Sequence, residues 1–263
     1  MNPGANPILQ LQGVTVSSLR EASVPVLAGV NWTVAPGEFW VVAGRQHSGK
    51  TDLLLTAAGL LPPLAGVCRL LGRDTRDFGG AELAERRQLG LVFANGRLFN
   101  ELTLGENIAL PLCYHRHLTG PAAEREIRPL LERLELTPLA AAAPATVSLD
   151  WLKRAALARA LALQPQVLLC DQPLGGLGLR HRQWWLQFLD QLARGQDGLG
   201  GPPMTLVVTT EELPPWQHPA RRFAFLRDHQ FFPLGDWTAL ARVADPALRE
   251  LLAAPAESPA PPL

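Results

Sequence analysis

Residues 44–51 constrain this chain more than any other segment, because they match the phosphate-binding pattern G-x-x-x-x-G-K-[ST] at every fixed position. An apolar run at positions 38–43 leads into the segment, and positions 52–58 read as a helix leading out. A strand, a glycine-rich loop and a helix in this order form the context in which the pattern holds phosphate. The segment therefore predicts a phosphate site made of Gly44, Arg45, Gln46, His47, Ser48, Gly49, Lys50, Thr51 and Asp52.

Two side chains in this segment have the chemistry that a nucleoside phosphate and Mg²⁺ require. Backbone N–H groups of the loop and the first helical turn face the phosphate, and Lys50 adds a compact positive charge. Thr51 offers a hydroxyl to Mg²⁺. The chain has two lysines, Lys50 and Lys153, against 22 arginines, so a lysine at this position departs from the general composition. The alternative, a glycine-rich turn with a chance Lys-Thr pair, does not account for the flanking strand and helix.

His47 stands where such loops often have glycine. If the loop needs a positive φ there, histidine is among the less penalised residues, at a cost of about 1 kcal/mol.

Length and composition indicate one large domain and exclude some partners. With 263 residues, 47% of them hydrophobic, we expect one domain over residues 1–254 with a helical subdomain at about 98–163. The Pro/Ala-rich tail at 255–263 is expected to be disordered. A net charge of zero with no basic stripe argues against nucleic acid as a partner. No signal peptide or bilayer-spanning run is seen, which predicts a soluble, cytoplasmic protein able to dock onto a membrane protein.

Strand signals alternate with helical patterns along the chain. Two runs at 8–16 and 29–34 alternate apolar and polar residues and predict an N-terminal antiparallel region. Helical periodicity dominates 104–163, and 179–194 reads as an amphipathic helix. Strands separated by helices predict an α/β fold with a mainly parallel sheet flanked by helices. Further strand signals lie at 67–71, 89–93, 167–171, 204–209, 222–227 and 230–234, and two short helices follow them.

Asp171 ends a wholly apolar run at 167–170. Sites that hold a nucleotide on such a loop need a second acidic group on Mg²⁺, at the end of a neighbouring buried strand. The alternative is an aspartate that caps a helix or a turn, but the strand leading directly into Asp171 favours the metal role. The predicted Mg²⁺ ligands are therefore Thr51 and Asp171.

Beyond the loop and Asp171, the segments 91–99, 104–112, 155–163, 168–173 and 207–211 follow in the order found in one family. Over nearly its whole length the chain resembles the ATP-binding cassette (ABC) transporter ATPases, a type of P-loop NTPase. Positions 93–96, 153–157 and 245–252 resemble the branch that drives MCE/Mla-type lipid transporters of the bacterial envelope. The resemblance implies ATP and Mg²⁺ as cofactors. It implies a membrane permease and a second cassette, identical or different, as partners, and a location on the inner face of the cytoplasmic membrane.

The segment aligned with the family signature L-S-G-G-Q departs from it, because Ser148 is the one matching residue among positions 147–151. Leu149 adds bulk where the family has glycine, and Asp150 adds negative charge where a phosphate of the partner cassette is expected. Ser148 with Asp150 instead predicts a helix end whose N–H groups are capped by its own side chains.

Four more family positions are altered. Gln172 replaces the catalytic glutamate, Thr210 the switch histidine, Ala94 the Q-loop glutamine and Gly178 the D-loop aspartate. Loss of a general base or a transition-state donor typically costs about 10²–10⁴ in rate. The sequence therefore predicts ATP binding with weak or absent hydrolysis. Two alternatives stay open: an active ATPase in which Gln172, or Thr210 with Glu211, substitutes for the missing groups, and a non-enzymatic scaffold with a vestigial site.

Overall fold

The computed structural model of the chain describes residues 6–78, 87–196, 198–199 and 201–253. The chain divides into two compact units, one made of residues up to 76 together with 208 onward, the other of residues 77–207. Across the described ranges, every helix is too short or too polar to cross a bilayer. The single domain over 1–254 with its helical subdomain stays a prediction, and the tail at 255–263 lies outside the described residues.

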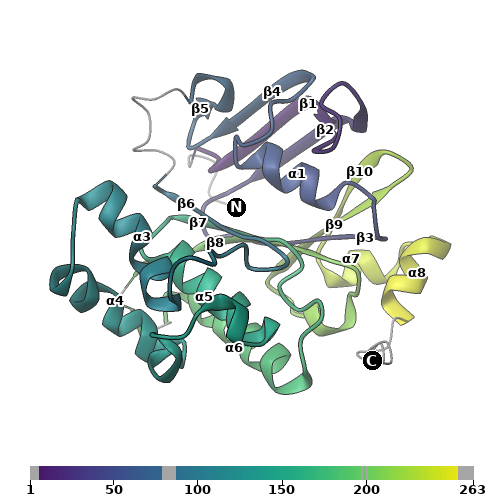
Figure 1. The fold of residues 1–263 in the computed structure, drawn as a ribbon. Coiled ribbons are helices and arrows are strands. Elements are labelled where there is room, and N and C mark those ends of the chain that lie inside the picture. Colours follow the sequence, from purple (N-terminus) through teal and green to yellow (C-terminus); the bar gives the residue numbers. More distant parts are fainter. Residues whose placement is uncertain (1–5, 79–86, 197, 200, 254–263) are drawn as a thin grey trace. The chain divides into compact units, whose positions relative to one another are not determined.

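The first unit contains an antiparallel sheet. Its strands are β1 (Leu9–Ser17), β2 (Pro25–Val34), β4 (Ala65–Leu70) and β5 (Arg73–Asp74), in the order β2-β1-β4-β5 (Figure 1). Every neighbouring pair runs antiparallel. Over much of β1 and β2, buried apolar side chains alternate with more exposed ones. This alternation is typical of an antiparallel sheet that has one face in the core and the other in solvent. The predicted N-terminal antiparallel region is confirmed.

A second group of strands in the same unit positions the phosphate loop. β3 (Phe39–Gly44) runs parallel to β9 (Arg221–Arg227), which forms an antiparallel hairpin with β10 (Gln230–Gly235). All six residues of β3 are buried, so this strand lacks alternation because both of its faces are covered. The loop that follows Gly44 therefore begins at the end of a fully buried strand, which fixes its position.

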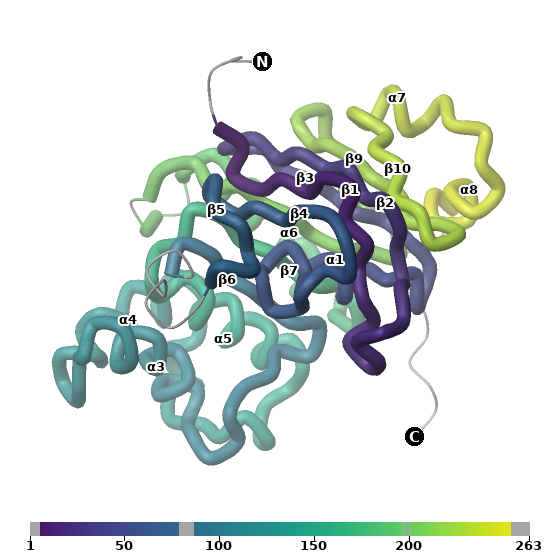
Figure 2. Tube along the Cα trace, turned by 90° about the horizontal axis from the view of Figure 1, so that it is seen from above, coloured from purple at the N-terminus to yellow at the C-terminus, as the bar shows by residue number. Residues whose placement is uncertain are grey.

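Three helices of the first unit accompany these strands. α1 (Lys50–Ala57) follows β3 after the loop. α7 (Trp237–Ala241) packs against β9 and β10 (Figure 2), and α8 (Pro246–Ala253) contacts β3. A 3₁₀ turn at Pro214–Trp216 precedes β9, and another at Thr75–Asp77 follows β5.

The second unit is mainly helical around a parallel strand pair. β6 (Leu89–Val92) and β7 (Val167–Cys170) run parallel. α3 (Leu104–Arg116) packs against α4 (Pro121–Arg133) and α5 (Leu149–Leu161). The remaining elements are α6 (Leu179–Arg194), two 3₁₀ turns at Thr137–Leu139 and Pro144–Thr146, and β8 (Thr205–Thr210), which lies at the boundary of the two units.

Local sequence explains where these helices begin and end. Thr103 and Glu106 form a reciprocal capping box at the start of α3, which satisfies two N–H groups there. α4 begins with Pro121 at a position where its missing N–H costs nothing. α6 has the predicted bounds and ends at Gly195, whose φ of 65° suits a left-handed C-cap. One side of α6 is buried in the unit and consists of Arg182, Trp185, Phe188, Leu189 and Leu192.

Candidate functional site

The loop between β3 and α1 has the backbone geometry of a tight phosphate-binding turn. A Cβ at Gly44 would collide with Ser48 Oγ and lie 3.2 Å from Leu226, so glycine is required there. Gly49 has a φ of 90° and stands immediately before α1. His47 has a φ of 63°, which confirms that the loop holds this histidine in the left-handed region.

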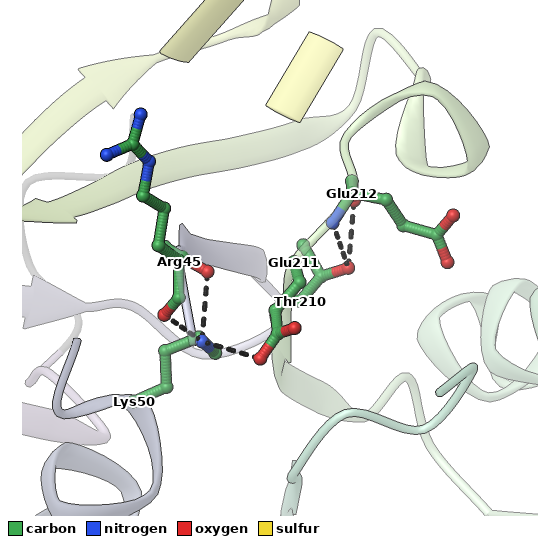
Figure 3. A network of polar contacts seen from close by, with 6 residues as sticks. Arg45, Lys50, Thr210, Glu211 and Glu212 are labelled. Carbon is green, nitrogen blue, oxygen red and sulfur yellow. Dashed lines mark hydrogen bonds and ion pairs between the residues drawn. The ribbon is translucent and has the colours of Figure 1, made fainter. Parts of the chain in front are cut away.

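The amine of Lys50 lies inside the loop, and its side chain is 3% exposed. Its Nζ donates hydrogen bonds to the backbone oxygens of Gly44 (2.9 Å) and Arg45 (2.6 Å). It also lies 3.2 Å from Oε1 of Glu211, with which it forms an ion pair (Figure 3). The positive charge is therefore located where the loop and the first turn of α1 meet.

The other loop residues divide between exposed and anchored positions. Arg45 forms an ion pair with Glu250 of α8, and Gln46 is exposed. Asp52, in the first turn of α1, accepts the backbone N–H of Leu19 at 2.7 Å, which fixes the turn between β1 and β2 against the helix. Thr51 is half-buried beside it.

The residues present fit the phosphates of a nucleotide. The N-cap residue of α1 is Gly49, which has no side chain to cap the helix, and the helix dipole favours an anion at this end. The Oγ of Ser48 is buried and finds no hydrogen-bond partner within the described residues. A buried hydroxyl without a partner is costly, and a phosphate oxygen would satisfy it. Together with the Lys50 amine, these groups form an anion site that the protein itself leaves incomplete.

Thr210 is the last residue of β8, and its hydroxyl is hydrogen-bonded to residues that follow it closely in the sequence. Its Oγ1 accepts the Nε1–H of Trp216 (3.1 Å) and the backbone N–H of Glu212 (3.2 Å), and it donates to the backbone oxygen of Glu212 (2.8 Å). A hydroxyl has one donor and two acceptor positions, and all three are used. Thr210 therefore has no O–H left to donate to a ligand in this conformation.

In the second unit, Asp171 directly follows β7 and is 4% exposed. Its backbone N–H donates to the oxygen of Val92 at 2.8 Å. Gln172 follows with a φ of 43°, an uncommon left-handed conformation for glutamine. The carboxyl group is therefore placed at the end of a buried strand, as the sequence pattern suggested.

Lys153, in α5, fixes the segment that follows Asp171. Its Nζ donates to the backbone oxygens of Gln172 (2.8 Å) and Gly175 (2.6 Å), with Pro173 at 3.4 Å. The sequence pattern places Lys153 in a family segment and does not predict this positioning role. The available signal was that lysine appears at two positions in a chain that otherwise uses arginine.

Burial lowers the pKa of Lys153 from 10.5 to about 8, although the nearby carboxylates of Asp171 and Asp150 act to raise it. Between pH about 8 and 10.5 the unfolded chain therefore binds more protons at this position than the folded chain, so folding stability from this group rises with pH. We expect the free energy of unfolding of the wild type, minus that of Lys153→Met, to increase by about 1.4 kcal/mol per pH unit in this window.

Urea unfolding at pH steps from 7.5 to 10.5 measures this difference. Subtracting the variant removes the contributions of titrating groups far from Lys153, because both proteins share them. A difference that stays flat, or that falls with pH, would contradict the buried-amine interpretation.

The N-terminus of α5 corrects one prediction. Ser148 occupies the N-cap position, but its side chain accepts no hydrogen bond from the described N–H groups of the first turn. Its hydroxyl donates instead to Oδ2 of Asp150 (3.4 Å), whose Oδ1 accepts the N–H of Gly178 (3.3 Å). The predicted capping of α5 by Ser148 and Asp150 is wrong because the Ser148 hydroxyl is turned to the Asp150 carboxylate, whose other oxygen accepts from Gly178 in the loop before α6.

The remaining altered positions have ordinary packing. Leu149 contacts Gly176, whose φ is 72°, and a Cβ there would lie 3.0 Å from the leucine side chain. Ala94 is half-buried in the segment after β6. Gly178 precedes α6, and its backbone N–H donates to Oδ1 of Asp150.

A family model described as ABC transporter matches residues 27–175, more than half of the chain. The sulfate/thiosulfate import ATP-binding protein CysA of Synechococcus elongatus is 38% identical over 173 residues, which cover 65% of this chain and 49% of that protein. The methionine import ATP-binding protein MetN of Caulobacter vibrioides is 37% identical over 193 residues, covering 72% of this chain and 55% of that protein. The chain thus spans about half the length of these curated relatives.

A solved structure gives the same result for the fold. The ATP-binding cassette MJ0796, described as a dimer in a post-hydrolysis state bound to ADP and Pi, superposes with a TM-score of 0.76 at 27% identity. The match covers 87% of this chain and all of that one. The predicted α/β fold of the ABC ATPase type is confirmed. This chain belongs to the ABC transporter family and has the nucleotide-binding fold of its ATPases.

Proposed function

We propose that this chain is the ATP-binding subunit of an ABC transporter, which binds ATP with Mg²⁺ at residues 44–52 and hydrolyses it weakly or not at all. The observation that supports ATP binding most is the incomplete anion site at the loop. There the buried Lys50 amine, the start of α1 behind Gly49 and the hydroxyl of Ser48 lie together. Magnesium, when bound, neutralises phosphate charge, and we propose Thr51 and Asp171 as its protein ligands.

Weak hydrolysis is supported by the groups at four altered positions. Gln172 has a neutral amide, which cannot take a proton from an attacking water. The hydroxyl of Thr210 is already fully used by Trp216 and Glu212, which weighs against Thr210 as a substitute for the switch histidine. Leu149 and Asp150 add bulk and negative charge at the aligned signature.

For partners we propose a membrane permease and a second cassette, which places the chain on the inner face of the cytoplasmic membrane. A second cassette with an intact signature would complement this one, and a copy of this chain would not. The lipid substrate is proposed from the short segments 93–96, 153–157 and 245–252 alone. The two relatives above are named for import of sulfate/thiosulfate and of methionine, which makes small polar solutes the second candidate class.

The test combines nucleotide binding with turnover. ATP with Mg²⁺ at about 100-fold above Kd should add roughly 2.7 kcal/mol to the stability of the wild type, seen as a raised Tm. Phosphate release should stay slow. Lys50→Ala should lose the ATP-dependent shift, and Lys50→Arg should lose most of it, because a planar guanidinium does not replace a compact ammonium between phosphates.

Two outcomes would contradict the proposal in different ways. Fast phosphate release that disappears in Lys50→Ala would refute weak hydrolysis and favour the fully active alternative. A Tm that ATP does not change, in a protein whose circular dichroism shows it folded, would refute binding and favour the scaffold alternative.

A further inference from the structure

The contact between Lys50 and Glu211 joins residues 161 positions apart in the sequence, both within the first unit. We propose that the Glu211 carboxylate is a built-in competitor for the phosphate of the nucleotide, and that it sets the affinity of the site by occupying the Lys50 amine until a ligand displaces it. This inference rests on the proposed ATP site and assigns it a further, affinity-determining residue.

The donor count of the amine supports competition. An ammonium has three N–H donors, and the contacts with Gly44 O, Arg45 O and Glu211 Oε1 are enough to engage all three. A phosphate oxygen therefore competes with these acceptors for the amine. The two backbone oxygens are fixed by the loop itself, whereas the Glu211 side chain is 39% exposed and can rotate outward. Glu211 is thus the acceptor that a ligand would displace.

Charge makes the displacement necessary as well as possible. A carboxylate and a phosphate on the same amine would be two like charges a few ångströms apart, which costs free energy at a partly buried site. The nucleotide must therefore release the ion pair before it gains its own contact with Lys50. Part of its binding free energy is used in this exchange.

The segment that presents Glu211 is rigid. The Thr210 hydroxyl is hydrogen-bonded to both the backbone N–H and the backbone oxygen of Glu212, and it also accepts the Nε1–H of the fully buried Trp216. Figure 3 shows Glu211 directed toward Lys50 and Glu212 directed away from it. Two neighbouring glutamates thus differ in orientation, which supplies a matched control.

Calorimetric titration with Mg-ATP, and separately with inorganic pyrophosphate, tests the proposal on wild type, Glu211→Gln and Glu212→Gln. We expect Glu211→Gln to bind both probes about 10-fold tighter or more, because the amide keeps the shape and removes the competing charge. Glu212→Gln should bind like the wild type. If Glu211→Gln is the one protein of the three that binds the probes measurably, this result would also support Glu211 as a competitor.

Unchanged or weaker affinity in Glu211→Gln, with a wild type that binds ATP, would overturn this inference and leave the proposed function standing. Absence of binding in all three proteins would overturn both.

A second readout needs no nucleotide. Because the chain has two lysines, a sample with isotope-labelled lysine side chains gives two Cε–Nζ signals in the NMR spectrum, assigned with Lys153→Met. Glu211→Gln should shift the Lys50 signal and leave that of Lys153 in place. Adding pyrophosphate to the wild type should shift the Lys50 signal too. A Lys50 signal unaffected by Glu211→Gln would refute the ion pair.

Discussion

Replacing Trp216 by alanine is expected to lower the free energy of unfolding by about 3–5 kcal/mol. The indole is fully buried and meets Phe39 of β3 edge-on, with ring centroids 6.2 Å apart. The guanidinium of Arg221 lies over both rings. Alanine would leave a cavity beside β3, which leads into the phosphate loop, and would remove a hydrogen bond from Thr210. The loss therefore combines apolar burial, a cavity and an unsatisfied acceptor.

Trp216→Phe separates these contributions. Phenylalanine keeps most of the buried ring and loses only the Nε1–H bond to Thr210, so we expect a cost of about 1 kcal/mol. Urea unfolding at neutral pH measures both variants. If alanine costs no more than phenylalanine, burial of the indole contributes little, and the packing argument for this segment fails.

Arg154→Ala should have the second largest effect, lowering the free energy of unfolding by about 3 kcal/mol. The Arg154 side chain is 1% exposed, and its guanidinium lies 3.8 Å from the ring centroid of Trp184 and 4.8 Å from that of Trp151. It also forms an ion pair with Glu135 at 2.8 Å. Desolvated cation–π contacts and the buried aliphatic stem of arginine both stabilise such an arrangement, and alanine removes both together.

Glu135→Gln is the control for Arg154→Ala. The Glu135 side chain is 48% exposed, so solvent weakens its ion pair, and glutamine keeps an oxygen to accept the hydrogen bond. We expect this variant to lose about 1 kcal/mol or less. A larger loss in Glu135→Gln than in Arg154→Ala would show that the ion pair, rather than packing against the two indoles, stabilises α5.

The sequence predicted best what depends on neighbours along the chain. The strand, loop and helix around residues 39–57 follow from local pattern, and so does the left-handed His47. α6 matches the predicted range because its apolar side repeats with helical spacing and Gly195 ends it.

The sequence predicted least where contacts join distant positions. Local rules assign Ser148 and Asp150 to a helix cap, but Asp150 finds its partner at Gly178, 28 residues away. The Lys50–Glu211 ion pair spans 161 residues, and no spacing rule connects the two. The role of Lys153 likewise depends on the fold, which places its amine beside the backbone of the segment after β7. These contacts arise from tertiary packing, which a single sequence does not specify position by position.

Both lysines of the chain are almost completely covered, at 3% and 1% exposure. Amine-directed cross-linkers and acylating dyes consequently meet no surface lysine on the folded chain. Mapping of its contacts with other proteins through side chains therefore has to rely on carboxylate, arginine or photoreactive chemistry, and a modified Lys153 marks a molecule whose interior has opened.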